Sequence, residues 1–283
     1  MAIQISGTTV IDNSRNLTNI ESVAGNGIAT QAEAEAGTVN NQIMTPLRTS
    51  QALATRNPTV ETLTTSGTYV KDLTLDQERS VLIELWGAGG SGGRRADSDG
   101  MAVGGGGGAY VRLLTQLKFL GTSEIYTIGS GGVARTTNGT GATGGATTFY
   151  GATANGGAGG SQAVWNNSNT SVSGASGGSA IRGISVSFDI TFSGGSSTSL
   201  ILINNPVNDP GTELIQGAAG GHARRAGTDT AGLGGVSTFG GNGGAGSTTG
   251  NASAGVVPGG GGGASCSLNS GAGANGQVRI TIL

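Results

Sequence analysis

The chain has 283 residues, 58 of them glycine, and its 14 basic and 16 acidic side chains give a net charge of −2. This length allows one large domain or two smaller ones, and the charge balance excludes the basic surface that nucleic-acid-binding proteins require. The low proline content, five residues, and the runs of consecutive glycines exclude the Gly-X-Y repeat of collagen.

The glycine content indicates ordered structure rather than a flexible linker. Ordering a glycine costs roughly 0.5 to 1 kcal/mol more than ordering an alanine, so folding must offset a total on the order of tens of kcal/mol. Disordered chains combine few apolar residues with a high net charge, whereas here the net charge is small and apolar segments interrupt the glycine tracts at definite places. The sequence therefore predicts a layered scaffold in which glycines let backbones approach closely.

Residues 1–60 predict a small region of short strands and helices. Residues 3–5 and 8–12 are rich in β-formers and are joined by a tight Ser-Gly link. Thr30 and Glu33 have the spacing of a capping box, which predicts the start of a short alanine-rich helix.

A second short helix is predicted from Thr45, a suitable N-cap residue, and Pro46, which suits the first helical position. Residues 47–54 continue this helix. None of these N-terminal elements is long enough to bury a core alone, so we expect them to need partners.

Residues 61–283 predict a glycine-rich domain of mostly β and irregular structure. Residues 81–86 and 277–283 have the apolar patterns of strands, and we expect these strands to pair and close the domain. Strict alternation of apolar and polar residues within about residues 181–216 predicts a β-rich insertion that covers part of the glycine-rich layer.

Internal repetition in this domain predicts that neighbouring segments stack on one another. The sequence GGATTF at residues 144–149 recurs as GGVSTF at residues 234–239, and a run of five glycines followed by alanine occurs twice. Glycine tracts suit the extended helix with three residues per turn, because glycine alone fits at a crowded axis. We expect polyglycine-II-like segments between the strands, with Phe149 and Phe239 in the core.

Cysteine and histidine are too scarce for much familiar enzymology. Cys266 is the single cysteine, which excludes an intrachain disulfide, and His222 is the single histidine. Zinc sites built from these residue types, and Ser-His-Asp triads that do not use His222, are therefore excluded. We expect a protein that is not an enzyme and has no metal or cofactor. The first residues resemble no secretory signal and no apolar run approaches a membrane span, so we expect a soluble, intracellularly made chain without membrane insertion.

Both ends of the chain resemble tailed-bacteriophage tail-fibre proteins that carry a glycine-rich domain. The resemblance lies in the opening GTTVIDNSRNLTNI, in the helix pair ATQAEAEAGT and MTPLRTSQAL, and in the frame from VLIELWGAGG through GGGGGAYV to GQVRITIL. The chain departs from a complete fibre because it is short and lacks a long repetitive shaft.

The resemblance implies a virion component that mediates attachment to the host cell. In such proteins the N-terminal region joins other tail or baseplate proteins, often as a trimer, so residues 1–60 are expected to serve attachment and oligomerisation. The glycine-rich domain lies distally as a receptor-binding adhesin, whose loops recognise a surface glycan or an outer-membrane protein. The corresponding expectation is a homotrimer in the phage tail, assembled in the host cytoplasm.

Candidate receptor-binding residues lie in the interruptions between glycine tracts, because binding side chains concentrate on loops held by rigid frames. Two of these loops carry paired arginines near aspartates, and guanidinium groups bind phosphates or carboxylates of lipopolysaccharide or capsule bidentately. A tryptophan in a polar stretch can stack on a sugar face. The candidates are Arg94, Arg95, Asp97, Asp99, Trp165, His222, Arg224, Arg225 and Asp229.

Simpler roles stay open for several of these residues. Arg94 or Arg95 can form a solvated ion pair with the aspartates that follow in the same loop. Trp165 can equally be packed in the interior, and His222 alone indicates no particular chemistry. Trp86, at the end of a strongly apolar strand, is expected to be structural.

Two other functions compete with adhesion. A connector or collar fibre would dock other virion proteins through both of its ends. A polysaccharide depolymerase would need paired carboxylates in a cleft. Asp97, Asp99 and Asp229 are available for that role, but nothing in their spacing specifies catalysis.

Overall fold

The computed structural model describes residues 3–5, 8–11, 22–23, 26–37, 44–54, 57–164, 171–182, 188–197, 200–201, 218–225 and 229–283. The chain divides into two compact units, Met1–Pro58 with Leu283, and Thr59–Ile282. We call them the N-terminal unit and the glycine-rich unit. The sequence placed the boundary between residues 60 and 61, which lie inside strand β5 (Thr59–Leu63) of the glycine-rich unit.

The N-terminal unit contains two strand pairs among its described residues. β1 (Ile3–Ile5) runs antiparallel to β2 (Thr8–Ile11), and β3 (Ser22–Val23) runs antiparallel to β4 (Asn26–Gly27). These ladders are too short to form a hydrophobic layer, since stable isolated sheets need three or more strands with an apolar face.

Both predicted helices of this unit are present. α1 spans Gln31–Ala36 and begins at the predicted capping box. The Thr30 hydroxyl accepts a hydrogen bond from the Glu33 backbone N–H at 3.3 Å, and the Glu33 carboxylate accepts one from the Thr30 N–H at 2.8 Å. α2 spans Pro46–Ala54, with proline at its first position.

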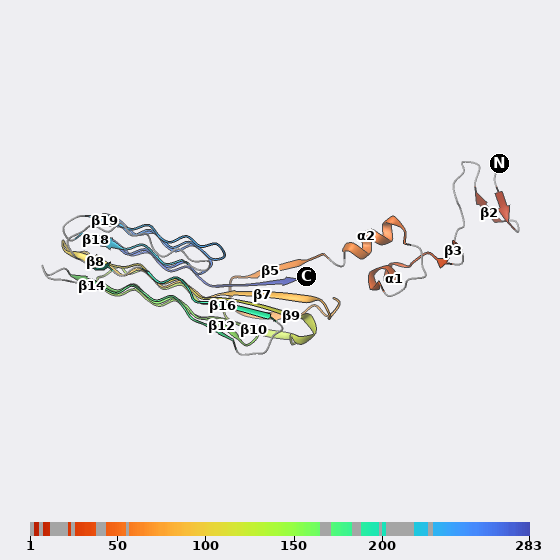
Figure 1. Ribbon diagram of the computed structural model, residues 1–283, viewed down its shortest axis with the longest axis horizontal. Coiled ribbons are helices and arrows are strands. Elements are labelled where there is room, and N and C mark those ends of the chain that lie inside the picture. Colours follow the sequence, from red (N-terminus) through yellow and green to blue (C-terminus); the bar gives the residue numbers. More distant parts are fainter. Residues whose placement is uncertain are drawn as a thin grey trace. The chain divides into compact units, whose positions relative to one another are not determined.

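The glycine-rich unit is built on two antiparallel β-layers (Figure 1). The first layer is a five-stranded sheet in the order β16-β9-β7-β20-β5. Its strands are β5 (Thr59–Leu63), β7 (Ser80–Trp86), β9 (Tyr110–Gln116), β16 (Phe188–Phe192) and β20 (Gln277–Ile282). β7 and β20 bracket the glycine-rich tracts in the sequence and are direct neighbours in the sheet, with Trp86 opposite Gln277 and Val81 opposite Ile282.

The second layer consists of shorter strands. β6 pairs with β10, and β11, β12 and β15 form a three-stranded sheet. A bridge between Thr127 and Thr148 joins the two groups. The bounds are β6 (Gly67–Val70), β10 (Ser123–Tyr126), β11 (Thr147–Phe149), β12 (Ala152–Ala154) and β15 (Ala180–Arg182), and a 3-10 helix, η1 (Leu117–Phe119), follows β9.

The main hydrophobic core lies between these two layers. Val81, Ile83 and Leu85 alternate along β7 and have no exposed area. From the second layer, Phe149 packs its ring against Tyr69 edge-to-face, with centroids 5.8 Å apart. Each large apolar side chain that is fully buried contributes roughly 1.5 to 3 kcal/mol, so this sandwich anchors the unit.

The glycine tracts form a bundle of extended helices with a hydrogen-bond period of three residues. In segment 87–95, the first, fourth and seventh N–H groups donate to carbonyls of segment 103–109. The second, fifth and eighth donate to segment 139–145, and the third and sixth donate to segment 271–274. Three residues per turn is the period of the polyproline-II type of helix. The predicted polyglycine-II-like segments are therefore confirmed.

The helices of the bundle are packed hexagonally. Among the described residues, the segments 87–95, 103–109 and 259–266 form its interior, and each is hydrogen-bonded to six neighbouring segments. The neighbours of segment 259–266 are 87–95, 103–109, 218–221, 241–247, 252–256 and 270–276. Backbone hydrogen bonds to six surrounding segments thus hold every interior helix in place, which offsets the conformational cost of ordering glycine.

Glycine is required in this interior because the helices approach too closely for a Cβ atom. A Cβ on Gly92 would lie 2.0 Å from the carbonyl oxygen of Gly263, and one on Gly105 would lie 2.1 Å from that of Gly90. Favourable contacts begin at about 3.5 Å. The space that side chains would fill is therefore occupied by neighbouring backbone.

Two expectations need correction. The described residues 188–197 of the predicted insertion agree with the expectation only in part: β16 pairs with β9 and extends the five-stranded sheet at its edge, whereas residues 194–197 hydrogen-bond to the glycine-rich segments 103–109 and 174–178. Phe239 was expected in the core and is 54% exposed. Its repeat partner Phe149 lies in a strand of the sandwich, whereas Phe239 follows a helix on the outside of the bundle and only stacks on Tyr110, with centroids 6.5 Å apart.

Candidate functional site

The end of the bundle opposite the sandwich carries most of the predicted binding residues (Figure 1). A four-stranded sheet lies there, in the order β13-β8-β18-β19. Its strands are β8 (Gly100–Ala102), β13 (Gln162–Val164), β18 (Ala223–Arg224) and β19 (Thr230–Ala231), and a separate pair is formed by β14 (Ser171–Val172) and β17 (Leu200–Ile201). We define the loop end as residues 94–100, 135–140, 223–225, 229–231 and 265–270.

Arg94 ties three loops of the loop end together. Its guanidinium group donates to the side-chain oxygen of Asn138 at 2.9 Å. It also donates to the backbone carbonyls of Ser267 at 3.0 Å and Leu268 at 2.5 Å. The same Asn138 oxygen accepts a hydrogen bond from the Ala96 N–H at 2.9 Å. Arg94 is thus engaged within the protein, and its geometry is that of a residue that positions loops.

Arg95 and Asp97 form the local ion pair that the sequence left open. The Arg95 Nε atom contacts the Asp97 Oδ2 atom, and both side chains are partly exposed. Such surface pairs contribute about 0 to 1 kcal/mol, so this one fixes the loop conformation more than it stabilises the fold. Asp99 is exposed and accepts a hydrogen bond from the Ser98 hydroxyl at 3.3 Å. Asp99 therefore carries the displayed negative charge of this loop.

Arg224 and Arg225 place a second pair of arginines beside this loop. β18 pairs with β8, and the Arg225 N–H donates to the carbonyl of Gly100 at 2.9 Å. Both arginine side chains are half-exposed, and Asp229 is exposed. Burial lowers the pKa of the Arg224 guanidinium, although arginine stays charged at neutral pH. The loop end thus displays cationic groups with aspartates next to them.

His222 and Cys266 lie in the interior next to this surface. His222 is 3% exposed and Cys266 has no exposed area. Burial raises the pKa of the Cys266 thiol to about 12, and its Sγ atom lies 3.4 Å from the Gly100 carbonyl oxygen. His222 therefore does not belong to the surface that a receptor can contact, because its side chain is buried. Trp165 lies outside the described residues.

Trp86 belongs to a polar and aromatic cluster on the outer face of the five-stranded sheet. Its indole N–H donates to the Phe239 carbonyl at 2.9 Å. The buried Glu84 carboxylate accepts from the Tyr110 hydroxyl at 2.5 Å and from the Arg279 guanidinium at 2.6 and 2.8 Å. That guanidinium lies 5.4 Å from the centre of the Trp86 ring. The structural role predicted for Trp86 is confirmed.

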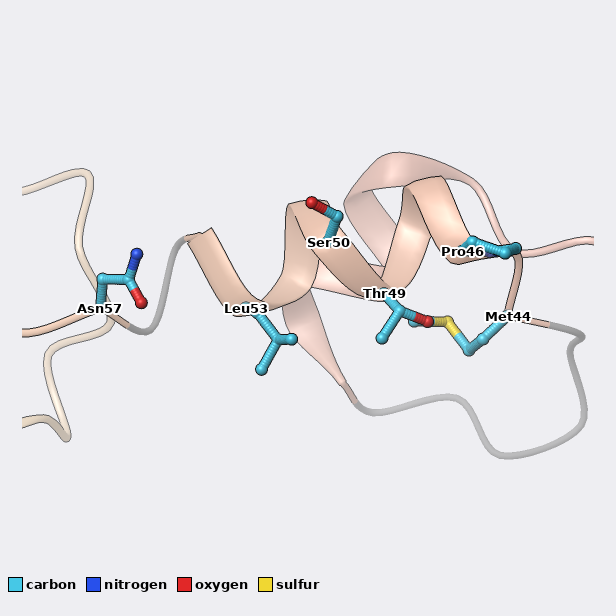
Figure 2. Close-up of a pocket in the computed structure, with 6 residues that line it drawn as sticks. All are labelled: Met44, Pro46, Thr49, Ser50, Leu53 and Asn57. Atoms are coloured by element: carbon cyan, nitrogen blue, oxygen red, sulfur yellow. The ribbon is translucent and has the colours of Figure 1, made fainter.

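An open apolar depression lies along α2 in the N-terminal unit (Figure 2). It is lined by Met44, Pro46, Thr49, Ser50, Leu53 and Asn57. Leu47 and Leu53 of the same helix are 63% and 61% exposed, whereas within residues 28–37 and 44–53 only Ala29 and Ala34 are buried. Exposed apolar surface of this kind is typical of a docking face.

The arrangement holds no metal cluster within the described residues, since no group of three or more His, Cys, Asp and Glu side chains is suitably placed. In the same part of the chain, no helix has both the length and the apolar character needed to cross a membrane. What the fold and the loop end define is a hexagonal bundle of glycine helices, anchored in a β-sandwich and carrying polar loops at its far end.

A family model described as a glycine-rich domain matches residues 64–283, and the chain belongs to this family. Comparison with curated proteins gives no match. The matched residues begin just after β5 and include the second layer, the bundle and the loop end.

Sequence reasoning missed the residues that hold the loop end in shape. Asn138 accepts from both Arg94 and Ala96, and the Arg135 Nε atom donates to the Thr140 carbonyl at 2.6 Å. The Arg135 N–H also donates to the Ser270 hydroxyl at 2.9 Å. No local pattern marks Asn138 or the contact with Ser270, because these partners lie in different glycine interruptions.

Proposed function

We propose that this protein is a tailed-phage virion component that attaches to the host cell surface through the loop end. The observation that carries the proposal is that polar loops, tied together by Arg94 and Asn138, stand at one end of a bundle whose interior helices are each joined to their neighbours by backbone hydrogen bonds. Rigid frames that present loops are the usual basis of recognition. The displayed residues in this proposal are Asp99, Arg224, Arg225 and Asp229, and Trp165 stays a candidate.

The ligand that fits these residues is an anionic surface glycan, or an outer-membrane protein of the same charge pattern. Half-exposed guanidinium groups bind phosphates and carboxylates with paired hydrogen bonds. In this proposal the protein acts by binding only, without catalysis or a cofactor. The ion pair between Asp97 and Arg95 supports binding rather than catalysis, because it engages one of the carboxylates that a hydrolase would need.

We propose that the N-terminal unit joins other tail or baseplate proteins, as a homotrimer in the virion that is assembled in the host cytoplasm. The exposed leucines of α2 support a docking role for this unit. The same observation favours the second candidate function, a connector or collar fibre, in which the loop end also docks a virion protein.

Binding of the labelled full-length chain to a panel of bacterial strains tests the proposal. We expect saturable binding to some strains, and at least tenfold weaker binding for the double variant Arg224→Ser/Arg225→Ser. Arg112→Ser is the matched control, because Arg112 is exposed on the five-stranded sheet, away from the loop end. Binding to no strain, with retention of the chain on intact phage tails, would favour the connector. Binding that the double variant leaves unchanged would exclude the loop end.

A further inference from the structure

The side of the sandwich formed by β5 and β6 has two open strand edges. β5 is the last strand of the five-stranded sheet and pairs only with β20 among the described strands. β6 pairs only with β10 in the same part of the chain. An unpaired strand edge presents N–H and C=O groups that another extended segment can use. Figure 1 shows β5 at the border of its sheet.

A groove lies between these two edges. We call it the edge groove, and it has a volume of about 270 Å³. Its lining residues are Thr59, Val60, Glu61, Tyr69, Val70, Asp72, Leu75, Ile280 and Ile282. Ile280 and Ile282 are buried members of the main core, so the bottom of the groove is the core itself. By contrast, Val60 and Val70 on its two rims are 62% and 72% exposed.

The edge groove is negatively charged. Glu61 and Asp72 are its only charged lining residues, and both are exposed. Both carboxylates act on the same wall residue: the pKa of Tyr69 is raised by burial first and then by the negative charges of Glu61 and Asp72. An apolar floor below two carboxylates is complementary to a long cationic side chain, whose methylene stem packs on apolar surface while its charge stays at the rim.

We propose that the edge groove binds an extended segment of a partner protein, with a lysine or arginine side chain between apolar residues. The segment adds to the open edge of β5 through main-chain hydrogen bonds, the mode known as β-augmentation. Apolar side chains two residues before and after the cation share its strand face and pack on the apolar lining of the groove, and the cation lies between Glu61 and Asp72. This inference is independent of host attachment, which we assign to the loop end of the bundle.

A short labelled peptide tests the inference on the full-length chain. The probe has the sequence Ser-Val-Thr-Arg-Thr-Val-Ser, in which both valines and the arginine share one face of a strand. We expect saturable binding by fluorescence anisotropy, and slower amide hydrogen exchange at residues 59–63 in the complex. Loss of two carboxylate partners in Glu61→Gln/Asp72→Asn should weaken binding about tenfold.

The matched control is Glu35→Gln/Asp76→Asn, which removes the same charge. Glu35 lies in the N-terminal unit, and Asp76 accepts a backbone N–H two residues on, as Asp72 does. We expect this variant to bind the peptide as the wild type does. A peptide with norleucine in place of arginine should bind as weakly as the groove variant binds the arginine peptide.

Three results would overturn the inference. The first is no saturable binding of the peptide up to about 1 mM, the concentration range of weak complexes. The second is equal affinity for the wild type and the groove variant, or for the two peptides. The third is protection of residues 59–63 by self-association that the peptide does not displace, which would assign the edge to a second copy of this chain.

Discussion

Replacement of Gly92 by alanine tests the claim that the bundle depends on absent side chains. The new Cβ atom would lie 2.0 Å from the Gly263 carbonyl oxygen, about 1.4 Å inside the shortest ordinary contact. Gly263 cannot move alone, because its carbonyl accepts from Gly271 at 2.8 Å and its N–H donates to Ser253 at 2.9 Å. Relief of the clash therefore breaks buried hydrogen bonds on neighbouring helices.

The expected loss of stability follows from these contacts. Overpacking of a tight interior costs about 1 to 3 kcal/mol, and each buried backbone group left without a partner costs about 1 to 3 kcal/mol. Alanine also restricts the unfolded chain, which returns about 0.4 to 1 kcal/mol. We expect Gly92→Ala to lower the unfolding free energy by about 3 to 5 kcal/mol, which lowers the Tm of a domain of this size by about 10 °C.

Gly250 provides the matched control. A Cβ there would have only the Ser247 hydroxyl within 4 Å, at 3.6 Å. Gly250→Ala should therefore leave the Tm unchanged or raise it slightly. Calorimetry or circular dichroism of both variants gives the comparison. A Tm for Gly92→Ala within about 2 °C of the wild type, or an equal loss for both variants, would refute the reasoning.

Three further predictions concern side chains. Burial raises the pKa of Cys266 to about 12, so the native chain should not react with iodoacetamide at pH 8, whereas the urea-unfolded chain should react. Mass spectrometry measures the alkylation, and rapid alkylation of the native chain would contradict the prediction. The pKa of Tyr110 is raised above its unfolded value near 10, first by burial and then by its hydrogen bond to the Glu84 carboxylate. The neutral phenol therefore stabilises the fold fully below about pH 10, and this contribution is lost as the pH rises further. Urea midpoints of the wild type should therefore fall faster above that pH than those of Tyr110→Phe, and parallel curves would argue against it. Arg279→Ala should lower the unfolding free energy by about 2 kcal/mol, because it leaves the buried Glu84 carboxylate without its cation. Lys118→Ala, at an exposed ion pair, should lower it by less than about 1 kcal/mol. Equal losses for the two variants in urea unfolding would refute the distinction.

The sequence predicts those parts of the fold that local patterns determine. The capping box at Thr30 is satisfied within one turn of α1, and the apolar alternation of β7 and β20 needs only a core on one side. The three-residue helices follow from the glycine tracts in the same way. These elements are recognisable because their stabilising contacts are made by residues close together in the chain, or by side chains of an obvious kind.

The arrangement of the helices cannot be predicted in this way. The neighbours of segment 259–266 come from six separate parts of the chain and are selected by backbone groups, which are the same at every residue. The repeat of residues 144–149 at 234–239 likewise gave no indication that one phenylalanine is buried and the other is exposed. Side chains carry no signal for a lattice whose specificity lies in the closure of main-chain hydrogen bonds.

The same physics frees the outer surface of the bundle from folding constraints. On the outer helix that includes Leu233 and Val236, every third residue points outward. These two side chains and that of Phe239, just after the helix, are 70%, 51% and 54% exposed. Residues 173, 176 and 179 form a comparable exposed row made of serine alone. A row of large apolar residues and a row of serines thus satisfy one backbone lattice equally well. Exposed substitutions away from special contacts change stability by less than about 0.5 kcal/mol, so the outward rows and the loops can change chemistry while the glycines stay fixed. A scaffold with this property suits a protein that must recognise changing surfaces, which is the physical reason to test the loop end for binding before catalysis.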